Sequence, residues 1–114
     1  MSFNKKYDLA QLIDAVGTGD DLKRMLGIFA ESTPKILASL NDNYINNNLD
    51  GVAESAHKLK ATIDILKIAE LQVVIRKMDR LPTVIENQDD LPQMINTTNT
   101  IMDQVISEIQ TTYL

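Results

Sequence analysis

The chain has 114 residues, a formal net charge of −5, 44% hydrophobic residues and no cysteine. That length supports a single domain, residues 1–114, and the composition is that of an ordinary folded protein. Without cysteine there is no disulfide framework or thiolate metal site, and the acidic charge opposes binding to nucleic acid or to anionic membranes. No apolar run approaches the ~20 residues of a membrane span. The N-terminus has no run of the signal-peptide type, so we expect a cytoplasmic protein.

Apolar residues recur with helical spacing over almost the whole chain, and this pattern predicts two helices before residue 46. Asp8 can cap a short helix that Gly17 ends. A longer helix begins at Asp20 or Asp21 and contains Pro34. Because the apolar stripe resumes on both sides of the proline, we expect a kink rather than a break, with two separate helices as the alternative.

Three asparagines, residues 46–48, mark the end of this long helix, because asparagine competes with helical hydrogen bonding and tolerates the left-handed conformation. The third predicted helix starts at Asp50. Its apolar positions form one stripe, which we expect to face the core: Val52, Ala56, Leu59, Ile63 and Leu66.

Two more helices complete the predicted fold. The fourth runs over about residues 68–81 and ends at Pro82. The fifth begins near Asp89 or Asp90, with Pro92 in its first turn. Short connections between long amphipathic helices imply that neighbours are antiparallel. The predicted fold class is therefore all-α, an up-and-down antiparallel four-helix bundle with a short additional N-terminal helix.

His57, the one histidine of the chain, lies on the polar side of the third predicted helix. At about 100° per residue it points roughly 140° from the centre of the apolar stripe, so we expect its imidazole to face solvent. An exposed imidazole is mostly neutral near neutral pH and has a nitrogen lone pair that can attack phosphorus. Lys60 on the same face can offset the charge of a phosphoryl group, as can Lys58 at longer reach. Ala53 and Ala61 have small side chains, which leave room beside the imidazole for a second protein to approach.

The segment 56–68 resembles the signature of histidine-containing phosphotransfer (HPt) domains, which are helical modules of multistep two-component signalling. That signature is His, any residue, Leu, Lys, usually Gly, a small polar residue and, about five residues later, Gly with an apolar residue. Four residues match it at the required spacing: His57, Leu59, Lys60 and Thr62. The first half of the chain, with Gly19-Asp20 before the long helix and Pro34 within it, also resembles the family.

Two positions depart from the family pattern. Ala61 stands where many members have glycine, and we expect the extra methyl group to slow docking of a partner without blocking it. Lys67 replaces the second glycine. If the backbone there is left-handed, a lysine has a conformational cost, and the turn into Ile68 is then built differently.

The resemblance implies that His57 accepts a phosphoryl group from the phospho-aspartate of one receiver domain and donates it to the aspartate of another. The implied partners are response-regulator receiver domains and a hybrid sensor histidine kinase. Mg²⁺ and most catalytic groups would belong to the receiver, so we expect a monomer that has no cofactor of its own and is not an enzyme with its own turnover. Besides His57 and the phosphate-stabilising Lys60, the expected docking surface consists of Lys58, Ala53, Ala61, Asp64, Leu12 and Met25.

Three alternatives remain. The chain can be an HPt-like adaptor that binds a signalling partner without chemistry, which the changed glycine positions favour. It can also be a structural dimerising bundle like that of histidine kinases. The least favoured alternative is a metal site formed by His57, Glu54 and Asp64, because one imidazole and two exposed carboxylates make a weak ligand set.

Overall fold

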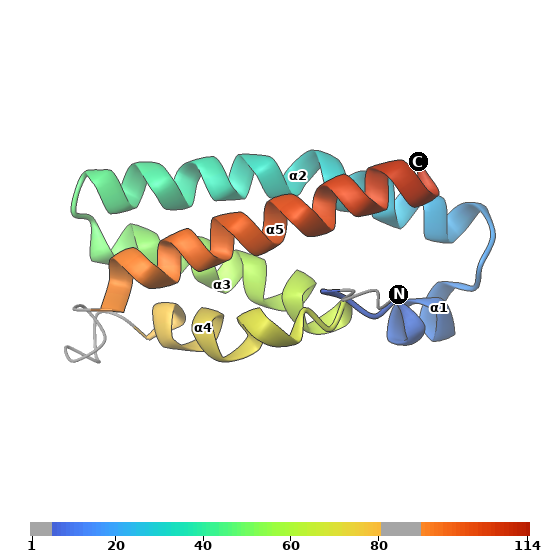
Figure 1. Cartoon of the computed structure of the whole chain (residues 1–114), viewed down its shortest axis with the longest axis horizontal. Helices are drawn as coiled ribbons and strands as arrows, with labels where there is room; N and C mark the ends of the chain where they lie inside the picture. Colours follow the sequence, from blue (N-terminus) through green and yellow to red (C-terminus); the bar gives the residue numbers. More distant parts are fainter. Residues whose placement is uncertain (1–5, 81–89) are drawn as a thin grey trace, which may run out of the picture.

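The computed structural model of the chain describes residues 6–80 and 90–114, and within them it contains helices and no strand. Leu81, Pro82 and Asp89, which the sequence pattern placed at helix ends, lie outside the described residues. The five helices are α1 (Ala10–Val16), α2 (Asp20–Ile45), α3 (Leu49–Ile65), α4 (Ala69–Asp79) and α5 (Leu91–Tyr113), as Figure 1 shows. The chain is therefore all-α, as predicted.

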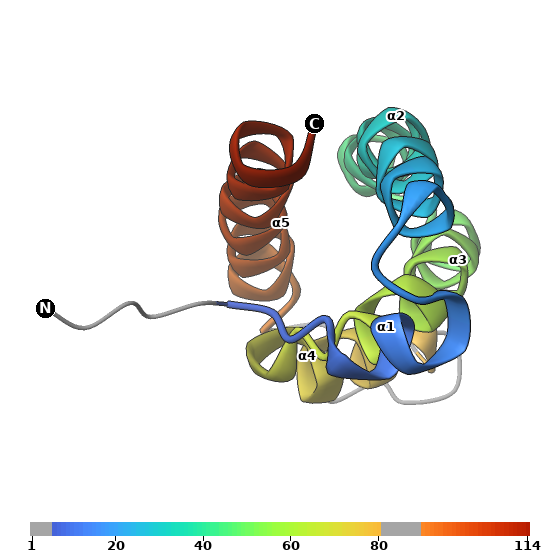
Figure 2. The same ribbon diagram turned by 90° about the vertical axis from the view of Figure 1, so that its right-hand side faces the viewer.

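The four long helices lie side by side around one apolar core. The helix α3 packs against both α2 and α4, and α5 packs against the same two helices from the other side (Figure 2). In Figure 1, α2 and α4 run one way along the long axis, and α3 and α5 run the other way. The short helix α1 packs against α2. The molecule measures 43 × 29 × 22 Å, and its length suits the 26 residues of α2, which span about 39 Å at 1.5 Å per residue.

The helix α2 continues through Pro34 without interruption, so the alternative of two separate helices is wrong. Pro34 is exposed, whereas Ala30, Thr33 and Leu37 around it are buried. A proline ring removes one backbone hydrogen bond and crowds the preceding turn. Here both halves bury residues in the same core, and that packing stabilises them as one continuous helix.

The turn between α2 and α3 uses asparagine in two ways. Asn47 adopts a left-handed conformation, with φ of 58°, as the asparagine run predicted. Asn48 caps the next helix by accepting a hydrogen bond from the backbone N–H of Gly51 at 3.0 Å. The helix α3 therefore begins at Leu49, one residue earlier than predicted, because the capping side chain is Asn48 rather than Asp50.

The end of α3 is a Schellman turn centred on Lys67. Lys67 has a φ of 47°, its N–H donates to the carbonyl of Asp64 at 3.2 Å, and the N–H of Ile68 donates to the carbonyl of Ile63 at 3.0 Å. This pair of bonds satisfies carbonyls that a helix end leaves without partners. The condition is met, because Lys67 is a non-glycine residue in a conformation that usually favours glycine. The turn itself is not built differently, since it has the two hydrogen bonds of an ordinary Schellman turn.

Most of the predicted ends of the outer helices agree with the structure. Gly17 ends α1 with a φ of 80°. The N-cap of α1 is Leu9 rather than the predicted Asp8, although the Asp8 side chain accepts a hydrogen bond from the N–H of Ala10 at 2.9 Å. Asp90 precedes the first residue of α5, and Pro92 lies in its first turn, where its missing N–H has no helical partner to lose. The whole apolar stripe predicted for α3 is at most 1% exposed: Val52, Ala56, Leu59, Ile63 and Leu66.

Candidate functional site

His57 projects from the side of α3 that faces away from the core. Its side chain is 72% exposed, whereas Ala56 and Leu59 on the opposite side of the helix are fully buried. The prediction that the imidazole faces solvent is confirmed. A nucleophile in this position rests on a well-packed helix and is still accessible to a second protein.

Asp79, in the last turn of α4, lies next to both His57 and Lys60 of α3. Its Oδ1 is 3.3 Å from Nδ1 of His57, and its Oδ2 is 3.7 Å from Nζ of Lys60. The Asp79 side chain is 22% exposed and that of Lys60 is 36% exposed. One partly buried carboxylate therefore faces the imidazole with one oxygen and the ammonium with the other.

Asp79 is not among the site residues predicted from the sequence. A signal was present, because Gln72, Arg76 and Asp79 lie on one edge of the apolar stripe of α4 at helical spacing. Such an edge contacts a neighbouring helix. Neither the neighbour nor the register of the pair can be read from one helix alone, so the contact with His57 appears only in the folded chain.

A second polar contact joins α3 and α4 beside the site. Asp64 accepts two hydrogen bonds from Nη2 of Arg76, at 3.0 and 3.1 Å, and one from the Gln72 amide at 3.4 Å. The Asp64 side chain is 36% exposed. Its carboxylate is thus held by α4, so it helps to fix the two helices relative to each other as well as forming part of the surface.

Three residues of the expected docking surface are exposed in the folded chain. Lys58 is 60% exposed and its ammonium lies 3.7 Å from the Glu54 carboxylate, Ala61 is exposed, and Met25 on α2 is 42% exposed.

Two residues expected on the docking surface, Leu12 and Ala53, are buried instead. Leu12 is 5% exposed and belongs to the apolar core, since α1 turns this residue inward. Ala53 is 8% exposed; it lies at the edge of the α3 stripe, where a methyl group is too short to extend past its surroundings. Neither can contact a partner without a rearrangement.

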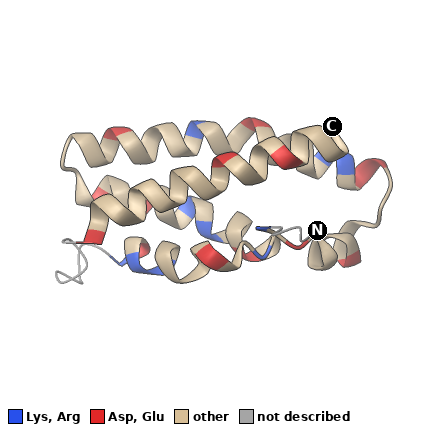
Figure 3. Cartoon of the chain, viewed as in Figure 1, with Lys and Arg blue, Asp and Glu red and all other residues tan. Residues whose placement is uncertain are grey.

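Basic residues gather on the half of the molecule that contains His57. Residues 57–80 contain three acidic side chains, whereas α5 has Asp103 and Glu108 and no basic residue (Figure 3). This excess of positive charge within an acidic chain makes the surface near His57 the part best suited to an anionic group. Residues 57–80 contain six basic side chains: Lys58, Lys60, Lys67, Arg76, Lys77 and Arg80.

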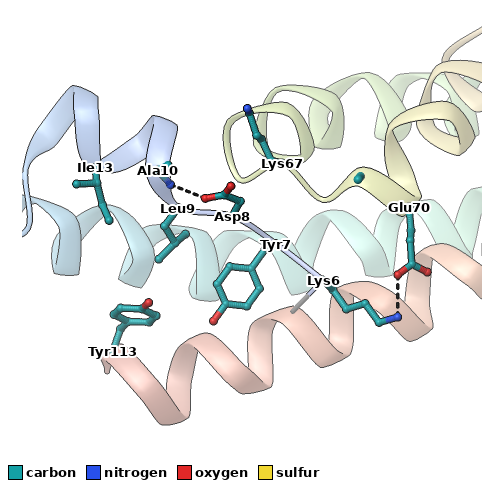
Figure 4. A pocket seen from close by; sticks show the side chains of 10 residues that line it. Lys6, Tyr7, Asp8, Leu9, Ala10, Ile13, Lys67, Glu70 and Tyr113 are labelled. Carbon is teal, nitrogen blue, oxygen red and sulfur yellow. Dashed lines mark hydrogen bonds and ion pairs between the residues drawn. The ribbon is translucent and has the colours of Figure 1, made fainter. Parts of the chain in front are cut away.

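A cavity of the molecule lies away from His57. It has a volume of about 750 Å³ and lies between the segment before α1, the turn into α4 and the end of α5 (Figure 4). Lys6 and Glu70 form an ion pair of 2.7 Å at its edge, and Tyr7 and Tyr113 line it. His57 does not line this cavity, and its imidazole is exposed on the surface of α3.

Two further properties concern the described residues, 6–80 and 90–114. They contain no group of three or more His, Asp or Glu side chains that is arranged to hold a metal ion. None of their helices combines the length and the apolar character needed to cross a bilayer.

Comparisons of the chain with protein-family models, with curated proteins and with solved structures gave no match. The HPt resemblance therefore rests on the residues of this chain.

Proposed function

We propose that this chain is a histidine phosphotransfer protein, in which His57 carries a phosphoryl group between receiver-domain aspartates. In this proposal α2 to α5 form an up-and-down antiparallel four-helix bundle of the HPt type, and α1 is the short additional N-terminal helix. The observation that carries the proposal is the 72% exposed imidazole of His57 on a helix whose opposite side is fully buried. Because the core holds α3 in place, its single histidine is presented to a partner in one orientation.

Lys60 supports the same chemistry. Its ammonium lies on the same edge of α3 as His57, and both approach the Asp79 carboxylate. A phosphoryl group adds negative charge at the imidazole, and a nearby ammonium offsets that charge. The basic residues of α3 and α4 favour the same anionic group.

The backbone at Lys67 is a further point in favour. The family pattern has its second glycine here, and the φ of 47° is one that glycine adopts without strain. The position therefore keeps the geometry for which glycine is normally used, although the residue has changed. The same observation weakens the case for a silent adaptor, which had drawn support from this substitution.

In this proposal the receiver domain supplies most of the catalysis. Phosphoryl transfer requires the attacking and leaving atoms to be nearly in line, together with neutralisation of charge on the phosphoryl oxygens. The chain contributes the His57 nucleophile, Lys60 and a docking surface. The receiver contributes the aspartate and Mg²⁺, so the chain acts as a relay and has no turnover of its own.

The experiment is a transfer assay with the full chain, several phosphorylated receiver domains and Mg²⁺. The expected result is a label on the chain that is acid-labile and base-stable, as a phosphoramidate is, and that is absent from the His57→Gln variant. Circular dichroism would verify that the variant keeps its helices. If the chain stays unlabelled with every receiver and also with phosphoramidate as a chemical donor, the relay is excluded and the adaptor becomes the better hypothesis.

A further inference from the structure

We propose that residues 6–16 form a latch, which opens and closes as one unit while the four long helices, α2 to α5, stay folded. The latch consists of residues 6–9, which are not helical, and the short helix α1. Its opening is a conformational property of the chain that does not depend on phosphoryl transfer at His57.

Polar contacts join the first part of the latch to the turn between α3 and α4. The backbone N–H of Asp8 donates a hydrogen bond to the carbonyl of Leu66 at 2.8 Å. The Lys6 ammonium donates to the Glu70 carboxylate at 2.7 Å (Figure 4). Leu66 follows the last residue of α3, so its carbonyl is one of those that a helix end leaves without an intrahelical partner. The closed latch therefore completes the capping of the helix that contains His57.

Buried apolar side chains hold the latch closed. Tyr7, Leu9 and Leu12 are 5%, 6% and 5% exposed, and all three belong to the apolar core. The closed state is favoured because these side chains are removed from water. Opening would expose the three together, including Leu12, which cannot contact a partner while the latch is closed.

The remaining packing of the latch is sparse. Leu12 is the one buried residue of α1, and α1 packs against α2. The cavity of about 750 Å³ shown in Figure 4 borders the latch, because six of the ten residues that line it belong to residues 6–16. A segment with so little buried surface is expected to open at a lower free energy than the core helices.

The connection between α1 and α2 is suited to act as the hinge. Gly17 and Gly19 lie on either side of Thr18. A Cβ at either glycine would meet no atom of the described residues within 4 Å, so crowding explains neither of them. Glycine has more backbone freedom than any other residue, and the pair therefore gives the chain a point about which the latch can turn.

The two parts of the latch should open together. The helix α1 has seven residues, and its N-cap is Leu9, whose side chain has no polar atom. A helix of this length is not stable by itself in water. The N–H of Ile13 donates to the carbonyl of Leu9 at 2.8 Å, so the first turn of α1 is continuous with the segment before it. When Tyr7 and Leu9 leave the core, α1 loses the packing that keeps it helical.

The test is native-state hydrogen exchange of the full chain, followed by NMR. The amide protons of Asp8, Ile13 and Gly17 report on the latch, because each donates a backbone hydrogen bond. The amide protons of Leu59 and Met102 report on the core, where both residues are fully buried. We expect the three latch amides to share one protection factor, at least about tenfold below that of the core amides.

Three variants separate local opening from global unfolding. Ile95→Val is a mild change at a buried position near the start of α5, at the end of the molecule away from α1 (Figure 1). It should lower the protection of the core amides by about twofold to tenfold and leave the latch amides unchanged, because the latch opens without unfolding α5. Lys6→Ala weakens the closed state and should lower the protection of all three latch amides by about twofold to fivefold. Lys35→Ala is its control, because it removes an exposed ion pair within α2, and it should leave the latch amides unchanged.

Three results would overturn the latch. If Ile95→Val lowers the protection of the latch amides as much as that of the core amides, residues 6–16 open only when the whole chain unfolds. If Lys6→Ala lowers the protection of Asp8 but not that of Ile13 and Gly17, residues 6–9 fray and α1 does not move with them. A protection factor near one for Asp8 in the unaltered chain would mean that the latch is not closed.

Discussion

Asp79 and His57 belong to different helices, yet a carboxylate oxygen of the first lies 3.3 Å from an imidazole nitrogen of the second. Their contact joins the last turn of α4 to the middle of α3, where the His57 imidazole is exposed. The same carboxylate approaches Lys60 at 3.7 Å. The candidate site is thus a set of three residues, of which the motif in α3 contains two.

Lys60→Ala should shorten the lifetime of phosphorylated His57 and slow transfer, because the ammonium that offsets the phosphoryl charge is lost. The fold should be unaffected, since partly exposed ion pairs of this kind change the free energy of unfolding by about 1 kcal/mol or less. The decay of labelled protein and its thermal unfolding would measure both effects. Lys35→Ala is the control, because Lys35 is an exposed lysine of α2 that pairs with Glu31 of the same helix. Equal decay in the two variants would remove Lys60 from the mechanism.

Leu59→Ala should lower the free energy of unfolding by about 2 to 5 kcal/mol, because it leaves a cavity where a fully buried side chain was. The neighbouring Lys58→Ala should change it by about 0.5 kcal/mol or less, because Lys58 is 60% exposed. Urea denaturation of both variants would measure the difference. A small effect at position 59 would mean that α3 does not pack as described.

Lys67→Gly should raise the free energy of unfolding by about 0.5 to 1 kcal/mol, because glycine adopts the observed φ of 47° without strain. Ala61→Gly is the matched comparison at the other family glycine position. Ala61 lies inside α3, where glycine costs about 1 kcal/mol relative to alanine. Opposite signs are therefore expected from urea denaturation, and a loss of stability in Lys67→Gly would contradict the strained turn.

The stability of the protein should fall as the pH rises from about 10 to about 12. Burial and the neighbouring Glu108 carboxylate raise the pKa of Tyr7 from 10.0 to about 12. Between these two pH values the folded protein retains a phenolic proton that the unfolded chain has released. Tyr7 therefore contributes stability below pH 10 that is lost at a slope of up to about 1.4 kcal/mol per pH unit.

Denaturation of the wild type and Tyr7→Phe over this pH range would isolate the contribution, because other groups titrate equally in both. The wild type should lose more stability than the variant as the pH rises. A difference between the two proteins that stays constant with pH would show that the pKa of Tyr7 is the same in the folded and unfolded states.

Helix ends and faces were predictable because they depend on short-range interactions. The left-handed Asn47, the turn at Gly17 and the inward stripe of α3 each follow from a few consecutive residues. The burial of Leu12 and Ala53 was not predicted. Each lies on a helix whose pattern alone does not show how closely a neighbouring segment covers it.

The sequence by itself determined which segments are helical, which side of each helix is buried and that His57 faces solvent, because helical periodicity links these properties to the order of the residues. The tertiary structure decided that α2 stays continuous through Pro34 and that Asp79 reaches His57. Both outcomes depend on how whole helices pack against one another. The register of α3 against α4 is set by many apolar contacts at once, and no local pattern specifies it.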